Sequence, residues 1–554
     1  MLALALAPRL WGVGWQLPSA LYFDELKYVE WAGSMAAGRA TETDFRNPSL
    51  YRHLLHFEYR AAALIMPSRD ERATALLQFL LARTTSGLLG ALACVLTGLA
   101  AAHLASSRSR PWDGPLAGIV AGVLLGWSLL HVHMSHYAVN DAVASCALAG
   151  GLLFGARAIR APTFWAFALA GLCAGLAAST KYNYGVVVAV PLAAACVALL
   201  RRDEPWHDES WRDRLQRDEP RHNLLLFGRR IALTVLGTVV GVLIGMPEVL
   251  WAAPALLAGM ADQADIGTRR WNGQVETPVG LLYVQALERG IGTSVLALAL
   301  LGGVVYGRHR PWALAALVSA PLLYLLVMLR TELFFARFAI PLLPFLVVLA
   351  ALGIGWIARQ PFRPIIRGAL AAGALAFALV PQAGAVLRHD RLATLPDTRV
   401  LAHEWLETHA SGDRVATETY GLPLNWAGKP PARYRLQRYG SLADVPTIEK
   451  LACDGVRYAL LASITYERKQ AWRGGQAAGY AELVRVARPV MTFDPFATPD
   501  GAAAHIDDTG LPFWNLDAYA RPGPRIEVYE FSEDAARAYC ASPTPAAALP
   551  DARG

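Results

Sequence analysis

Two adjacent carboxylates, Asp24 and Glu25, follow a short apolar stretch near the start of the chain. A carboxylate at a membrane boundary can act as the general base toward an acceptor hydroxyl group. Asp24 also precedes the segment "ELKYVEWAGSMAAG", where an aspartate would suit a helix N-cap, so this structural role stays open beside the catalytic one. Capping does not explain Glu25, and we expect both residues to belong to an active site.

Three basic residues stand where a membrane protein does not need positive charge for its orientation. Lys181 in "AASTKYNYG" lies between two apolar segments, and Arg337 in "RTELFFARFAIPLLP" begins another. An ionisable side chain at membrane depth is a functional candidate, although a lysine can also snorkel to the interface. Arg270 adds further charge in an outer loop. Because arginine binds phosphate in bidentate fashion, we expect these cations to hold an anionic headgroup.

A third polar group lies in the segment "HVHMSHYAVNDAVAS". Its histidines, among them His133 and His136, match no strong metal-ligand spacing. We therefore favour a polar cavity lining over a metal site, and leave a divalent cation open. Asp141 fits the same lining, or equally the N-cap of the next helix. Tyr182 is expected to line this cavity as well.

The elements that must position these residues are membrane-spanning helices. Of 554 residues, 55% are hydrophobic and 17% are charged, whereas soluble domains carry about 25% charged residues. Apolar runs of roughly 16 to 25 residues recur as far as about residue 388, and such runs suit bilayer-spanning helices. We expect about 11 spans, near residues 2–18, 78–105, 115–131, 142–156, 164–179, 184–200, 231–253, 291–306, 312–329, 340–357 and 368–387.

The net charge of +7 reflects membrane topology, and no nucleic-acid partner is expected. The basic residues gather in every second loop, as the positive-inside rule requires. The clusters are Arg108 and Arg110; Arg157 and Arg160; Arg201 and Arg202 through Arg229 and Arg230; Arg308 and Arg310; and Arg359, Arg363 and Arg367. If the chain starts in the cytoplasm, an odd number of spans places these basic loops inside and the C-terminal part outside. The sequence therefore predicts a multi-pass protein of the inner (cytoplasmic) membrane whose C-terminal part is extracytoplasmic.

The first outer loop, residues 19–77, contains a predicted interfacial helix. Its apolar residues recur at alternating steps of four and three, with basic residues elsewhere on the helical wheel, which is typical of a helix that lies in the membrane surface and contacts lipid. The apolar positions are Leu50, Leu54, Phe57, Ala61 and Leu64. Asn47 is the expected N-cap.

The C-terminal part differs in composition from the membrane region. We assign residues 1–388 to a transmembrane domain, 389–540 to an extracytoplasmic α/β domain and 541–554 to a disordered tail. Helical and strand patterns alternate between 389 and 540, which indicates a small α/β fold. The domain holds Cys453 and Cys540, and whether they pair is left open.

Taken together, these segments resemble a known family. The pieces are "FDE", "NPSLYRHLL", "SHYAVNDAVAS", "GLAASTKYNYG", "ARFAIPLLP" and, in the tail, "RVLAHEWLETHASGDRVATETYG". In their order and spacing they resemble the C-type (GT-C) glycosyltransferases that use polyprenyl-phosphate sugars, and more narrowly the bacterial protein mannosyltransferases and the lipid A aminoarabinose transferases. One departure is "NPSLYRHLL", which lacks the second proline usual in that segment.

The resemblance implies a GT-C-like helical membrane fold and inverting transfer of a sugar, from a polyprenyl-phosphate donor to a hydroxyl group at the outer membrane face. The acceptor would be a glycan, a lipid or a protein, as in protein glycosylation or the modification of lipid A or another cell-envelope glycan. Asp24 would be the base beside Glu25; Lys181 and Arg337, helped by Arg270, would hold the donor phosphate. Asp141 and its neighbouring histidines would line the cavity. No redox cofactor is implied.

Two other classes of function stay open. A transporter or flippase of a lipid-linked sugar would need similar cations, but the spans show no internal repeat of the kind that transporters often have. A membrane-anchored binding protein would leave the outer charged residues without a purpose. No Walker loop, Rossmann glycine fingerprint or kinase motif is present.

Overall fold

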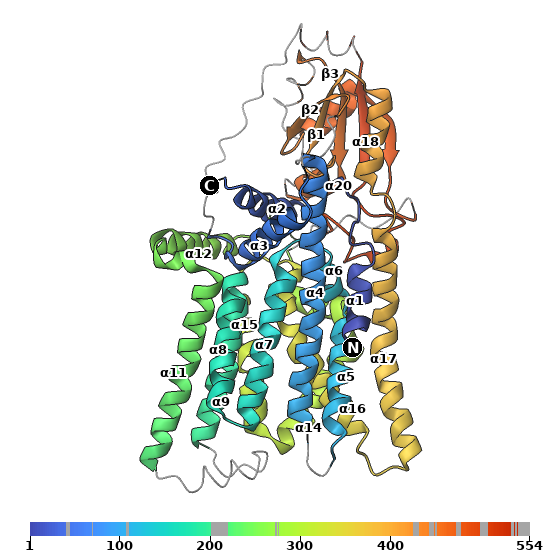
Figure 1. The fold of residues 1–554 in the computed structure, drawn as a ribbon. Coiled ribbons are helices and arrows are strands. Elements are labelled where there is room, and N and C mark those ends of the chain that lie inside the picture. Colours follow the sequence, from blue (N-terminus) through green and yellow to red (C-terminus); the bar gives the residue numbers. More distant parts are fainter. Residues whose placement is uncertain are drawn as a thin grey trace.

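The computed structural model describes the chain apart from residues 40–44, 69, 107–109, 201–219, 272–273, 275, 425–431, 443–447, 449–450, 452, 473–477, 499–507, 533, 535–536, 538–539 and 541–554. A bundle of long helices carries a five-stranded sheet beyond one of its ends (Figure 1). The fold class predicted from the sequence, a helical membrane protein with a C-terminal α/β unit, is confirmed. The expected disorder of residues 541–554 lies outside the described residues.

The bundle consists of α-helices joined in places by short 3₁₀ segments. Its α-helices are α1 (Leu2–Leu10), α4 (Glu71–Ala105), α5 (Asp113–Gly126), α6 (Leu129–Ser135), α7 (Asn140–Arg160), α8 (Phe164–Thr180), α9 (Ala189–Leu200), α11 (Pro220–Gly245), α13 (Val279–Ile291), α14 (Thr293–His309), α15 (Pro311–Met328), α16 (Leu343–Ile357) and α17 (Pro364–Ala393). The 3₁₀ segments are η1 (Tyr182–Val188), η2 (Pro247–Leu250) and η3 (Ala336–Leu342).

Among the described residues, seven helices are long and apolar enough to cross a membrane, or nine if two bent pairs each count as one span. The bent pairs are α5 with α6 and α13 with α14. The remaining two expected spans form shorter helices: α8 has 17 residues and α1 has nine. Helix α1 ends early because the chain turns at Gly12, whose φ of +70° favours glycine. The chain is a multi-pass membrane protein.

Helices α8 and α11 approach each other at the level of their backbones. A Cβ atom added at Gly171 or Gly175 of α8 would meet carbonyl oxygens of α11, and one at Gly237 or Gly241 of α11 would meet carbonyls of α8. Without a hydrophobic driving force in lipid, such small residues allow the close packing that holds membrane helices together. The glycines in these apolar segments therefore serve helix packing.

Three further helices lie at the end of the bundle on the side of the sheet: α2 (Phe23–Ala36), α3 (Leu50–Ile65) and α12 (Ala253–Gly267) (Figure 1). Helix α3 is amphipathic as predicted. On its apolar face Phe57 is 68% and Leu64 85% exposed, whereas Tyr51 on the other side is buried. Large apolar side chains left uncovered by protein suit a helix that rests on lipid.

The predicted N-cap of α3 is wrong. The helix begins at Leu50 with Ser49 in the cap position, and Asn47 instead accepts a hydrogen bond from the Tyr28 hydroxyl at 3.2 Å. Asp24 and Asp141 are not caps either, because the N-cap residues of α2 and α7 are Tyr22 and Val139. Both aspartates lie in the first helical turn, which leaves their carboxylates available for partners elsewhere.

The sheet is mixed, with strand order β2-β1-β3-β5-β4. Its strands are β1 (Arg414–Glu418), β2 (Arg435–Tyr439), β3 (Val456–Ala462), β4 (Ala487–Phe493) and β5 (Ile526–Phe531), accompanied by α18 (Thr398–His409), α20 (Ser463–Trp472), α21 (Ala478–Val486) and η4 (Leu516–Ala518). Strand β1 pairs in parallel with β2 and β3, and β5 runs antiparallel to β3 and β4. Apolar clusters cover both faces of the sheet, as in a small α/β fold.

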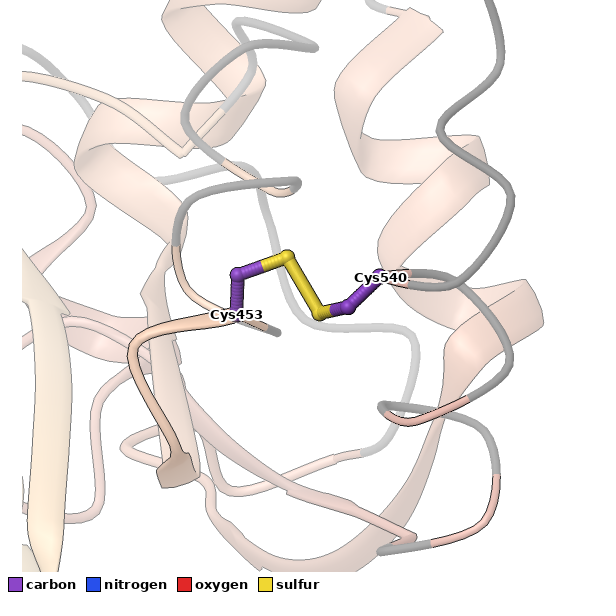
Figure 2. Close-up of a disulfide and its surroundings, with 2 residues drawn as sticks. All are labelled: Cys453 and Cys540. Atoms are coloured by element: carbon purple, nitrogen blue, oxygen red, sulfur yellow. A yellow bond between two sulfur atoms is a disulfide. The ribbon is translucent and has the colours of Figure 1, made fainter.

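A disulfide joins Cys453 to Cys540 and ties the C-terminal segment to the region before β3 (Figure 2). The bridged residues are 87 positions apart, so the bond closes a long loop. Closing a long loop removes conformational freedom from the unfolded chain. The pairing that the sequence left open is therefore present in the structure.

We expect the double variant Cys453→Ser/Cys540→Ser to lower the stability of the C-terminal unit by about 2–4 kcal/mol, the usual cost of losing such a bridge. Hydrogen exchange of β3 and β5 peptides in the full-length protein measures this effect. The matched control is Cys196→Ser, since Cys196 is a free, exposed cysteine of the membrane region. Equal exchange in the two variants would show that the disulfide contributes no stability.

Glu418 at the end of β1 is a buried carboxylate with several donors. It accepts hydrogen bonds from the Tyr480 hydroxyl at 2.6 Å and from the backbone N–H groups of Leu442 and Ala462 at 2.9 and 3.1 Å. Burial, which these hydrogen bonds offset only in part, raises the pKa of Glu418 from its ordinary 4.5 to about 7. The folded chain therefore holds a proton that the unfolded chain releases between these two values.

Because the folded state binds this proton more tightly, the stability of the sheet should be greatest below about pH 4.5 and fall as the pH rises to about 7. The fall should amount to roughly 1–3 kcal/mol. Hydrogen exchange of β3 at pH 5.5 and pH 8, corrected for the intrinsic rate, measures it in the full-length protein. The variant Glu418→Gln should remove the pH dependence; a dependence that persists in this variant would assign it to another group.

Candidate active site

Asp24, in the first turn of α2, forms an ion pair with Arg337 at the start of η3. The Arg337 NH1 group lies 2.6 Å from Asp24 Oδ2 and 3.0 Å from the Tyr22 hydroxyl. Lys27, one turn further along α2, lies 2.9 Å from Asp24 Oδ1. The structure thus brings together two of the residues that the sequence selected, from positions more than 300 residues apart.

The surroundings of Asp24 strongly favour its ionised form. Burial alone would raise the pKa of Asp24, but the charges and hydrogen bonds of Arg337 and Lys27 outweigh it and hold the pKa well below the usual range. A carboxylate held in this way is a weak base. Its basicity would recover if Arg337 were drawn to another anion.

A second ion pair joins Lys181, just after α8, to Asp141 in α7. The Lys181 Nζ atom lies 2.5 Å from Asp141 Oδ1, and the Tyr184 hydroxyl approaches the same oxygen at 3.5 Å. The Lys181 side chain is 18% exposed, whereas Asp141 is only 2% exposed. Lys181 is therefore partly exposed while its carboxylate partner is buried, which suits a cation that exchanges partners.

The two ion pairs belong to one charged cluster. Lys181 Nζ lies 5.5 Å from the centre of the Phe338 ring, which belongs to the residue after Arg337. Lys181 interacts electrostatically with both Arg337 and Asp24, and Arg337 with Asp141. Two cations and two carboxylates thus face one another where α2, α7, η1 and η3 meet.

Glu25 lies apart from this cluster and is fully buried against Arg83 of α4. Arg83 Nε and NH2 donate to Oε1 and Oε2 of Glu25 at 2.8 and 2.9 Å, and neither side chain is exposed. The backbone N–H of Ala138 also donates to Glu25 at 2.8 Å. With both oxygens occupied, Glu25 has the surroundings of a positioning residue, which anchors the first turn of α2 and hence Asp24.

His133 and His136 do not line a cavity as the sequence suggested; they are 5% and 0% exposed. His133 Nδ1 lies 3.1 Å from His389 Nε2 of α17, and the His136 ring contacts two backbone carbonyls. The reason is that α6 and the turn after it pack against α17, where His389 contacts both rings. Both histidines are therefore buried between α6 and α17 and do not belong to the charged cluster.

Tyr182 and Arg270 also have partners outside the cluster. The Tyr182 hydroxyl donates to the carbonyl of Phe45 at 2.7 Å, which ties η1 to the first outer loop. Arg270 is 44% exposed and lies 3.9 Å from Glu332. The structure thus keeps Arg270 at the rim, beside the segment that leads to Arg337.

Sequence reasoning missed three residues that support the site. Tyr22 accepts from Arg337, and its ring stacks on that of Tyr137 with centroids 4.1 Å apart. The Tyr137 hydroxyl accepts from the backbone N–H of Leu511 in the C-terminal part, so the tail reaches the site. Arg83 could have been predicted as a functional candidate, because a charged residue within an apolar helix is costly. Nothing in the sequence distinguishes the two tyrosines from other tyrosines.

A cleft of about 620 Å³ opens beside the site, between the turn after α1 and the end of α17. Its lining residues include Trp15, Gln16, His403 and Glu404, but neither Asp24 nor Lys181 nor Arg337. Trp15 makes an edge contact with Tyr137 at 5.7 Å between ring centres. The contacts of Trp15 with Tyr137 and of Tyr137 with Tyr22 thus connect the cleft lining to Arg337.

The first part of the chain matches a known family. Residues 1–240 match the family model described as dolichyl-phosphate-mannose-protein mannosyltransferase. This match confirms, over rather less than half of the chain, the family resemblance seen in the sequence. No curated protein matches the chain.

Solved structures with a similar arrangement include proteins of two kinds. The apo oligosaccharyltransferase of Archaeoglobus fulgidus matches with a TM-score of 0.49 and 11% identity, over 91% of this chain and 74% of that chain. ArnT from Cupriavidus metallidurans matches in the apo state (TM-score 0.47, 14% identity, 96% of this chain and 97% of that chain). The same protein bound to undecaprenyl phosphate gives 0.47 and 13%, over 95% and 96%.

Proposed function

We propose that the protein is a membrane glycosyltransferase that moves a sugar from a polyprenyl-phosphate donor to an acceptor hydroxyl, with inversion at the anomeric carbon. The observation that carries this proposal is the cluster of two carboxylate–cation pairs, Asp24–Arg337 and Asp141–Lys181. The family match of residues 1–240 supports the same chemistry. Mannose or a related hexose or pentose is the sugar class that we propose.

In this reaction Arg337 and Lys181 bind the donor phosphate. The acceptor oxygen forms a bond to the anomeric carbon while the bond from that carbon to the phosphate oxygen breaks. The electron pair of the broken bond stays on the phosphate, where the two cations stabilise the growing negative charge. The acceptor proton passes to a carboxylate oxygen of Asp24. We propose that these steps need no redox cofactor, and a divalent cation at the phosphate stays open.

The ion pairs of the structure suggest an order of binding. Without donor, Arg337 neutralises Asp24 and keeps it a weak base. A donor phosphate competes for Arg337, and the carboxylate then regains basicity close to the acceptor. The same phosphate competes with Asp141 for Lys181. Donor binding would thus activate the base before the acceptor reacts.

We place the site on the outer side of the cytoplasmic membrane. Arg160 and Arg310 donate to the carbonyls of His103 and Leu104 at the end of α4, which is the end of the bundle away from the sheet (Figure 1). Basic residues at that end support a cytoplasmic location for it. The disulfide of the C-terminal unit supports an oxidising compartment for the other end.

The position of the C-terminal unit suggests how the acceptor is bound. The cleft beside Trp15 and the contact between Tyr137 and Leu511 place the C-terminal unit next to the charged cluster. We propose that this unit helps to present the acceptor, which is a glycan, a lipid or a protein of the cell envelope.

A donor panel tests the function. Purified full-length protein in detergent is incubated with polyprenyl-phosphate sugars and crude envelope as acceptor, and free polyprenyl phosphate is measured. Release that depends on acceptor supports the transferase. If the protein binds a donor, moves it across proteoliposomes and never releases polyprenyl phosphate, a transporter of lipid-linked sugar replaces it.

A further inference from the structure

A second group of side chains, separate from the charged cluster, is buried where the turn after α6 meets α17, and its side chains are of types that can bind a metal ion. It consists of His136, His389 and Asp390, with His133 beside them, and the first three are 0% exposed. One ligand atom from each of the three lies within 4.8 Å of the other two. Histidine nitrogens and a carboxylate oxygen are the donors that zinc and similar divalent ions prefer.

The hydrogen bonds of His136 leave one of its nitrogens in an unusual position. Nδ1 lies 3.0 Å from the carbonyl oxygen of Val132, and because a carbonyl only accepts, a neutral ring that forms this hydrogen bond carries its proton on Nδ1. In neutral imidazole the other nitrogen, Nε2, then presents a lone pair. Nε2 nevertheless faces two oxygens, the Trp11 carbonyl at 3.1 Å and Asp390 Oδ1 at 3.5 Å. A neutral ring in either tautomer thus leaves one nitrogen lone pair facing an oxygen, and a second proton or a metal ion at Nε2 would relieve this contact.

The carboxylate of Asp390 favours the metal ion. Its Oδ1 atom lies 3.1 Å from His389 Nδ1, but its buried Oδ2 atom has no hydrogen-bond partner among the residues that the structure describes. A proton on His136 would satisfy Nε2 and leave this carboxylate oxygen unpaired, which is costly in a buried place. A divalent ion can bind both imidazoles and also the carboxylate through both of its oxygens, so that Oδ2 gains a partner.

The spacing of the donor atoms also suits a metal. Four ligands at the 2.0–2.1 Å bond lengths of zinc are about 3.3 Å apart at the corners of a tetrahedron. The contacts of Asp390 Oδ1 with the two histidine nitrogens, 3.1 and 3.5 Å, lie on either side of this value, and the ligand atoms of the two histidines lie within 4.8 Å of each other. The remaining nitrogens have partners of the kind that orient metal ligands: His136 Nδ1 the Val132 carbonyl, and His389 Nε2 the ring of His133.

We propose that His136, His389 and Asp390 bind a divalent transition-metal ion of the zinc type, which clamps the turn after α6 to α17. Tyr137 follows His136 directly and stacks on Tyr22, which in turn holds Arg337. The ion would thus fix the layer that supports the charged cluster without touching the donor. This site is independent of the proposed transferase reaction.

The test measures metal directly. The full-length protein is produced in zinc-supplemented and in cobalt-supplemented cells, purified without chelator or affinity metal, and analysed by mass spectrometry of its metals. We expect about one metal ion per chain, and in the cobalt form the visible absorption of four-coordinate Co²⁺. The variants Asp390→Asn and His136→Gln should lower the metal content at least tenfold, whereas the control His409→Gln, in α18, should keep it.

Two results would overturn the proposal. Less than a tenth of an ion per wild-type chain under both conditions would favour a protonated His136 in place of a metal. Full occupancy in both Asp390→Asn and His136→Gln would place the metal elsewhere. Because the wild-type cobalt spectrum needs no variant, the test still decides if a variant fails to fold, and neither readout depends on transferase activity.

Discussion

Replacing Asp24 with asparagine is expected to stop sugar transfer while leaving donor binding intact. The amide cannot take up the acceptor proton, and a general base of this kind contributes roughly 10²- to 10⁴-fold to the rate. Donor affinity should be kept or increased, because Arg337 no longer has a charged partner at 2.6 Å. Release of polyprenyl phosphate and donor binding, measured on the same preparation, separate the two effects.

Asp265→Asn is the matched control, since Asp265 is an exposed carboxylate of α12 paired only with Arg269 among the described residues. It should leave both quantities unchanged. If Asp24→Asn turns over donor at the parent rate, Asp24 is not the base. If it loses donor binding instead, the residue organises Arg337 and the catalytic assignment fails.

The pH dependence of the same reaction gives an independent check. The pKa of Asp24 is held below its usual range while Arg337 is its partner, so kcat/KM, which reports the free enzyme, should stay level into acid solution. In the donor complex Arg337 is shared with phosphate, and the acid limb of kcat should lie at higher pH. Identical acid limbs for the two parameters would contradict donor-activated basicity.

The second large effect concerns stability: Arg83→Met should destabilise the protein by about 3–5 kcal/mol, because it leaves Glu25 as a buried, unpaired charge. Arg83 also donates to the carbonyl of Trp15 at 2.8 Å, so the turn after α1 loses a contact as well. Thermal unfolding in detergent measures the change. The double variant Arg83→Met/Glu25→Gln should recover part of the loss, since no charge remains buried.

Arg72→Met is the control for this pair, because Arg72 is an exposed residue at the start of the same helix. The single variant Glu25→Gln then distinguishes a positioning role from a catalytic one. Assayed below its unfolding temperature, it should keep turnover within about tenfold of the parent, far from the loss expected for Asp24→Asn. An equal loss in both variants would make Glu25 part of the chemistry, as the sequence suggested.

Much of the architecture was predictable because its signals are local. Hydrophobic length marks a membrane helix wherever the segment lies, the helical spacing of apolar residues identified α3, and alternating helical and strand patterns indicated the α/β fold of the C-terminal unit. The charged residues Asp24, Asp141, Lys181 and Arg337 were also predictable as candidates, since a charge beside lipid is costly enough to need a function.

The pairing of these residues was decided by the tertiary structure. Asp24 and Glu25 are neighbours of the same chemical type, yet one faces Arg337 at a partly open site and the other is buried on Arg83. Successive residues of a helix point about 100° apart, and only the packing of α2 determines which direction is open. The same holds for His136 and the distant pair His389 and Asp390, which α6 and α17 bring together.

The sequence by itself thus determined which segments enter the membrane and which residues carry costly charge, because hydrophobicity and charge are properties of each residue. The tertiary structure alone decided which charge meets which partner, which carboxylate is open and which histidines are buried. These outcomes depend on contacts between segments that lie from 40 to 313 residues apart in the sequence, and such contacts form only when the helices pack.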